Sequence, residues 1–308
     1  MRELPLTFSR GFFMGSADIV PGVSGGTVAL VFGIYRRLIE AIRLGSSALG
    51  HFLKLDVAGA VERLRRVEWG FLITLLAGIG TAVLALSHII EVLLEDRPVE
   101  MAGLFLGLVL ASVVIAWGLL QTRDLFRVLC LVGSAVVVFL LMGLTSGTSE
   151  DSVSQLSTPA LWAFFGAGAI AICAMILPGV SGSFLLVTMG MYGAVLGAVN
   201  DRDLLSVGVF LLGCIVGLAL FSQLLHWALD RHYDTVMALL IGLMLGSLRV
   251  LWPWPGGVES TELASPSGPV AVPVLLAVVG FVLVMAVDIV AKRLEHRSTQ
   301  DEVEDLHA

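Results

Sequence analysis

The residues best suited to binding an anion lie in two short segments of matching sequence. Asp18-Ile-Val-Pro-Gly-Val-Ser-Gly-Gly26 recurs as Met175-Ile-Leu-Pro-Gly-Val-Ser-Gly-Ser183, in apolar surroundings both times. Proline removes a backbone donor and glycine permits a sharp turn, so each segment is expected to interrupt a helix. Where a helix restarts, its free N–H groups, its peptide dipoles and nearby hydroxyls attract anions. We therefore interpret both segments as the tips of an anion site.

The candidate binding residues are those of the two tips and two arginines that follow the first tip. They are Pro21, Gly22, Ser24, Gly25, Gly26, Thr27, Pro178, Gly179, Ser181, Gly182, Ser183, Arg36 and Arg37. A second interpretation is that each tip is only a tight bend with serine as the helix N-cap. For the two arginines, simple anchoring at the inner membrane surface is the favoured interpretation over binding of phosphate headgroups.

Asp18 is a carboxylate within an otherwise apolar approach to the first bend, and its counterpart in the second segment is Met175. An ionisable group inside a membrane indicates proton or ion coupling. The alternative is a structural carboxylate paired with a helix N-terminus or with an arginine. Cys130, Cys173 and Cys214 show no metal-binding spacing, so we predict no metal and no cofactor.

Long uncharged runs must position these tips. Only 14% of the 308 residues are charged and 57% are hydrophobic, whereas soluble domains have about 25% charged residues. Because about 20 apolar residues of helix span a bilayer, segments 69–90, 99–121, 127–144, 204–227 and 270–290 are predicted to cross it. The shorter segment 235–251 is a sixth candidate. We predict an all-α polytopic membrane protein.

The repeated motif predicts two homologous halves. The first repeat, 1–145, has a re-entrant helical hairpin at 10–35, a cytoplasmic insertion at 36–68 and three of the helices. The second repeat, 150–291, has a re-entrant hairpin at 160–199 and the other three, and 292–308 is a polar cytoplasmic tail without regular structure. Residues 152–200 carry no charge and are too many for a single crossing, which is why this segment must fold back.

The basic residues predict that the two repeats have opposite orientations. The insertion and the C-terminal tail are rich in arginine and lysine, which places both in the cytoplasm. The two hairpins then enter from opposite faces, and only Arg97, Arg202 and Arg249 lie outside. Such an inverted-topology repeat is typical of secondary transporters. Both termini are expected in the cytoplasm.

The motifs Gly15-Ser-Ala-Asp-Ile-Val-Pro-Gly-Val-Ser-Gly-Gly-Thr27 and Leu177-Pro-Gly-Val-Ser-Gly-Ser183 resemble those of a known family. They are similar to the bacterial polyprenyl-phosphate transporters of the PopT type, formerly a family of unknown function, over about residues 8–292. The resemblance implies a protein of the bacterial cytoplasmic membrane that returns undecaprenyl phosphate from the outer to the inner leaflet for envelope polysaccharide synthesis. It implies an anionic lipid as the partner, no nucleic acid, and no enzymatic activity.

Moving a negative charge inward against an inside-negative potential costs about 2.3 kcal/mol per 100 mV. Proton coupling through Asp18 is our hypothesis for meeting this cost. A carrier or channel for another anionic lipid or a small anion is an alternative. Less favoured is an intramembrane serine hydrolase, because both tips match G-x-S-G and either His88 or His226 is a conceivable base.

Overall fold

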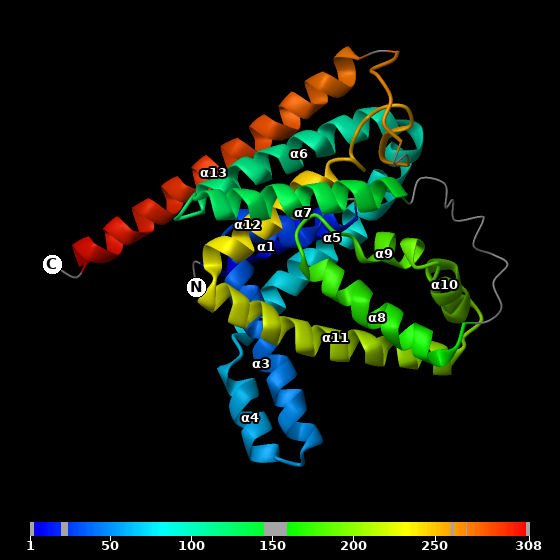
Figure 1. Ribbon diagram of the computed structural model, residues 1–308. Helices are drawn as coiled ribbons and strands as arrows, with labels where there is room; N and C mark the ends of the chain where they lie inside the picture. The colour runs from blue at the N-terminus through cyan, green and yellow to red at the C-terminus, as the bar shows by residue number, and fades with distance from the viewer. Residues whose placement is uncertain (1–2, 20–23, 145–158, 260–261, 269, 306–308) are drawn as a thin grey trace.

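The computed structural model describes residues 3–19, 24–144, 159–259, 262–268 and 270–305, and within these ranges the chain is helical and has no strands (Figure 1). The first half contains α1 (Glu3–Asp18), α2 (Gly25–Val31), α3 (Tyr35–Leu53), α4 (Val57–Arg66), α5 (Trp69–Asp96), α6 (Pro98–Gly118) and α7 (Leu125–Leu144). The second contains α8 (Leu161–Ile176), α9 (Gly182–Thr188), α10 (Tyr192–Asn200), α11 (Leu204–Arg231), α12 (Tyr233–Ser247) and α13 (Ala271–Asp305).

Five helices are long and apolar enough to cross a membrane: α5, α6, α7, α11 and the first 20 residues of α13. All five correspond to segments predicted from the sequence. The sixth candidate, 235–251, forms α12, which has only 15 residues. Large apolar side chains such as Leu84 and Leu204 are more than 80% exposed on these helices, as expected for residues that face lipid. The chain is a multi-pass membrane protein.

The helices associate in four long pairs. Within each half, α1 packs along α5 and α8 packs along α11, while between the halves α6 packs along α13 and α7 along α12 (Figure 1). Glycines permit this close approach, since a Cβ at Gly103 or Gly107 would collide with the α13 backbone. A Cβ at Gly242 or Gly246 would likewise collide with α7, so these G-x-x-x-G pairs are helix-packing faces.

Residues 36–68, predicted as an insertion, form the α3–α4 hairpin, which projects away from the rest of the bundle (Figure 1). Its α3 helix also packs against α11. The prediction that the chain lacks regular structure after Ala291 is wrong, because α13 continues to Asp305. No glycine or proline follows Gly280, so nothing in the local sequence ends this helix.

Candidate functional site

The first motif ends in α2, which begins at Gly25 with Ser24 as its N-cap. The Ser24 hydroxyl accepts a hydrogen bond from the Gly26 amide at 3.1 Å. Asp18, the last residue of α1, accepts one from the Gly25 amide through Oδ1 at 2.6 Å. The sequence predicted that the first turn of this helix would offer unpaired amides to a ligand, but two protein side chains already hold two of them. In this conformation Asp18 is therefore the partner of a helix N-terminus, which is the structural alternative to a role in ion coupling.

The second motif turns at Leu177–Val180 and restarts as α9, with Ser181 as its N-cap. Gly179 has φ +80°, a backbone conformation that favours glycine, and a Cβ built on it would lie 2.8 Å from the Met244 Cα in α12. The Ser181 side chain makes no capping hydrogen bond and instead lies 2.8 Å from the Ser183 hydroxyl. With Met175 in the position equivalent to Asp18, no carboxylate of the motif reaches the start of α9.

A cavity of about 260 Å³ brings the two motifs together. Asp18 and Ser24 line it from the first motif, and Ser181, Gly182 and Ser183 line it from the second. Apolar side chains of α8, α9 and α11 complete its wall. The cavity thus combines three hydroxyls with one carboxylate, from segments more than 150 residues apart in sequence.

Two contacts at the Ile176 carbonyl join the halves beside this cavity. The Tyr35 hydroxyl donates a hydrogen bond to the Ile176 oxygen at 3.1 Å, and the tyrosine side chain is buried. Gly26 lies so close that a Cβ built on it would be 2.9 Å from the same oxygen. The position of the first tip relative to the second therefore depends on close contact at this carbonyl.

The remaining candidate residues lie elsewhere or outside the described part of the chain. Pro178 is fully buried, and Thr27 lines a different cavity. Pro21 and Gly22 lie outside the described residues. Each restarted helix has only seven residues, so its aligned peptide dipoles are few and the hydroxyls of the cavity are the main donors for an anion.

Both arginines are engaged at the α3 end of the molecule. Arg36 forms an ion pair with Asp230 at 2.7 Å, and Arg37 pairs with Glu68 and lies over the Phe71 ring. Neither lines the cavity between the motifs. In this conformation acidic partners from α11 and from the α4–α5 connection hold both arginines, and their role in binding a phosphate headgroup stays a prediction.

The sequence analysis missed Tyr35 as the residue that links the motifs. A signal for it was present, because Gly33-Ile-Tyr35 recurs as Gly190-Met-Tyr192 at the same offset as the motifs.

The histidines proposed as bases for a hydrolase lie away from the motif serines. His88 is largely exposed beside Glu91. His226 lies between Glu40 and Asp230, with its two ring nitrogens 3.2 and 3.1 Å from their carboxylates. The Ser24 and Ser181 hydroxyls have the partners described above, so neither serine forms a nucleophile–base pair with these histidines.

Apolar spanning helices around a cavity of hydroxyls and a single carboxylate are the features of a membrane transport protein. Comparison with known proteins agrees with this class. The chain belongs to the undecaprenyl phosphate translocase-like family (VCA0040-like), whose model matches residues 14–267. It is a family of transporters and not of enzymes.

Two relatives illustrate the family. The chain is 41% identical over 249 residues to the polyprenyl-phosphate transporter of Vibrio cholerae serotype O1, covering 80% of this chain and 77% of the relative. It is 30% identical over 257 residues to the polyprenyl-phosphate transporter of Staphylococcus aureus, covering 79% and 84%. No solved structure matches the chain.

Proposed function

We propose that this protein transports polyprenyl phosphate, and that it returns undecaprenyl phosphate from the outer to the inner leaflet of the bacterial cytoplasmic membrane. The observation that carries the proposal is the cavity in which both motifs meet, in a chain whose relatives are named polyprenyl-phosphate transporters. In this proposal the phosphate binds in that cavity, while the lipid chain stays in an apolar environment.

The proposed architecture is an inverted repeat with two re-entrant hairpins and both termini in the cytoplasm. The pattern of helix contacts supports it. If each helix is replaced by its counterpart in the other half, the α1–α5 pair becomes the α8–α11 pair. In the same way the α6–α13 pair becomes the α12–α7 pair. Duplicated elements that exchange in this way are the basis of alternating access in many secondary transporters.

The second motif is the better acceptor of a phosphate. Ser181 and Ser183 offer hydroxyl donors to the cavity, and α9 lacks a side-chain cap. At the first motif Asp18 holds the Gly25 amide. A phosphate that enters must therefore either displace this carboxylate or lie beside it, and two like charges in a poorly solvated cavity repel strongly.

Protonation of Asp18 removes this conflict. A neutral carboxyl group no longer repels the phosphate, and its hold on the Gly25 amide weakens because a charged acceptor makes the stronger hydrogen bond. Substrate anion and proton would then occupy the cavity together. The proton also offsets one negative charge moved against the membrane potential, worth about 2.3 kcal/mol per 100 mV.

The test uses purified protein in proteoliposomes with labelled undecaprenyl phosphate and an imposed pH gradient. We expect Asp18→Asn to transport the lipid at a rate that no longer depends on the pH gradient. Glu91→Gln is the matched control, since it removes an exposed carboxylate at the end of α5 and should behave as wild type. If Asp18→Asn retains the full pH-gradient dependence, the coupling role is wrong. If wild-type protein moves inorganic phosphate and leaves the lipid in place, the small-anion alternative replaces the proposed substrate.

A further inference from the structure

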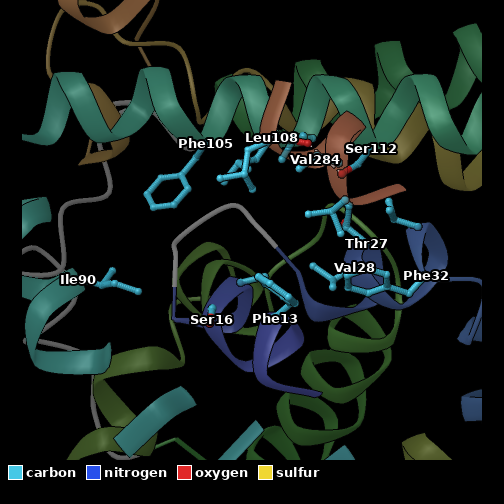
Figure 2. A pocket seen from close by; sticks show the side chains of 15 residues that line it. Phe13, Ser16, Thr27, Val28, Phe32, Ile90, Phe105, Leu108, Ser112 and Val284 are labelled. Carbon is cyan, nitrogen blue, oxygen red and sulfur yellow. Dashed lines mark hydrogen bonds between the residues drawn. The ribbon is translucent and has the colours of Figure 1, made fainter. Parts of the chain in front are cut away.

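A second cavity, of about 220 Å³, lies beside α2 (Figure 2). It is enclosed by α1, α2, α5, α6 and α13, and its wall is almost entirely apolar. Figure 2 shows Thr27 and Val28 of α2 facing Leu108 and Ser112 of α6. We call it the α2–α6 cavity.

An apolar groove of about 280 Å³ lies next to the α2–α6 cavity, between α1 and α13. Phe13, Phe32 and Val287 line both, and the groove extends along α1 to Leu6 and Arg10. The two apolar spaces are therefore neighbours, one beside α2 and the other toward the N-terminal end of α1.

One polar group in the α2–α6 cavity has no partner. The Thr27 side chain is only 2% exposed, and its hydroxyl makes no hydrogen bond. The other two hydroxyls of the wall are satisfied by their own helices, Ser16 by the Phe12 carbonyl and Ser112 by the Leu108 carbonyl. A buried hydroxyl without a partner is unfavourable, so Thr27 is a donor available to a ligand in this cavity.

We propose that the α2–α6 cavity and its groove bind the isoprenoid chain of the substrate at the end next to the phosphate. This inference rests on the proposed function and extends it, because it assigns the chain to a separate cavity. Ser24 lines the cavity between the motifs and Thr27 lines the α2–α6 cavity, only three residues further along the chain. At about 1.5 Å per residue of helix, the two sites are separated by less than one turn of α2.

An amphipathic lipid fits this arrangement. Its phosphate lies at the polar side of α2, its chain passes along the apolar side, and the Thr27 hydroxyl donates to the ester oxygen that joins them. The wall carries the aromatic rings of Phe13, Phe32 and Phe105 together with branched aliphatic side chains, which suit a bulky, methyl-branched chain. The mouth of the groove opens beside α13, where the rest of a long chain can remain in the bilayer.

The first experiment is photolabelling in lipid nanodiscs. The probe is a 55-carbon polyprenyl phosphate that carries a diazirine on the isoprene unit next to the phosphate. We expect wild-type protein to be labelled at residues that line the α2–α6 cavity or its groove. Labelling confined to residues outside both overturns the proposal. Equal labelling of the same residues by a diazirine-bearing phosphatidylglycerol also overturns it, because the cavity would then be a general acyl-chain groove.

The second experiment measures binding to variants. Val284→Trp places an indole in the α2–α6 cavity, and we expect it to weaken binding of the long-chain lipid about tenfold or more. The matched control is Val282→Trp, two residues away on α13 and exposed outside the cavity, which should bind as wild type. Thr27→Val should weaken binding about fivefold, and Thr27→Ser should not.

The outcomes separate this inference from the proposed function. If wild-type protein does not bind or move the long-chain phosphate, the proposed function fails. If wild type binds it and Val284→Trp binds it as tightly as Val282→Trp, the chain lies elsewhere and only the present inference fails. Photolabelling of wild-type protein decides the question even if the tryptophan variant does not fold.

Discussion

Replacing Gly26 by alanine tests whether the two motifs act as a unit. The new Cβ would lie 2.9 Å from the Ile176 oxygen and 3.2 Å from the Ser24 hydroxyl. The atom it meets first belongs to backbone, and that carbonyl is also held by the Tyr35 hydroxyl, so it cannot rotate away as a side-chain end could. The first tip must therefore move away from the second by several tenths of an ångström.

Forcing an extra methyl group into a packed site costs about 1–3 kcal/mol. If 1.4 kcal/mol of this cost destabilises the conformation that binds substrate, the apparent affinity for the lipid decreases about tenfold. We expect Gly26→Ala to lower both the thermal unfolding midpoint of the purified protein and its rate of lipid transport in proteoliposomes.

The matched control is Gly197→Ala, a helical glycine of α10 with nothing within 4 Å of the added methyl group. Alanine is the better helix former there by up to about 1 kcal/mol, so this variant should be as stable as wild type or more stable. If Gly26→Ala equals Gly197→Ala in both measurements, the contact at the Ile176 carbonyl does not hold the tips together, and the reasoning fails.

Three further predictions concern residues that do not line the cavity between the motifs. Tyr35→Phe removes one buried hydrogen bond between the halves and should lower the free energy of unfolding by about 1 kcal/mol, as measured by denaturation in detergent. Gly107→Ala should destabilise the α6–α13 pair by about 1–3 kcal/mol, whereas Gly80→Ala, which meets nothing, should be tolerated in the same assay. The hydrogen bond from Arg43 lowers the pKa of Glu40 below its ordinary 4.5, so Glu40 stabilises the folded state above that pH and loses this contribution as the pH falls through the lowered pKa. Glu40→Gln should therefore make the thermal midpoint less dependent on pH on the acidic side, and an unchanged acid profile would contradict the assignment.

Much of the helical framework could be predicted because it depends on local composition. A bilayer requires about 20 apolar residues of helix, so the five spanning helices are visible as uncharged runs. The restart of helices at Ser24 and Ser181 followed from proline and glycine in the preceding turn. The end of α13 was not predicted, because this helix passes from apolar to polar sequence without interruption.

The details of the site could not be predicted because they depend on contacts between distant segments. Nothing in the spacing of the first motif shows that Asp18 reaches the Gly25 amide, since that depends on how the end of α1 and the start of α2 are placed relative to each other. Whether Arg36 faces the motif or pairs with Asp230 depends on how α3 packs against α11, 194 residues later in the chain. Thr27 was grouped with the tip because it is next to Gly26, but the helical rotation from Ser24 directs it into the α2–α6 cavity.

The pairing of α6 with α13 has a consequence for how the protein is made. When α6 leaves the ribosome, about 153 residues still separate its end at Gly118 from the start of its partner at Ala271. At about 5–20 residues per second, this corresponds to roughly 8–30 s of synthesis. During that interval the flat glycine surface of α6 has no native neighbour and is exposed to lipid, to α5 or to insertion factors. Biogenesis must therefore keep an early segment unpaired in the bilayer until the last spanning helix of the described chain arrives.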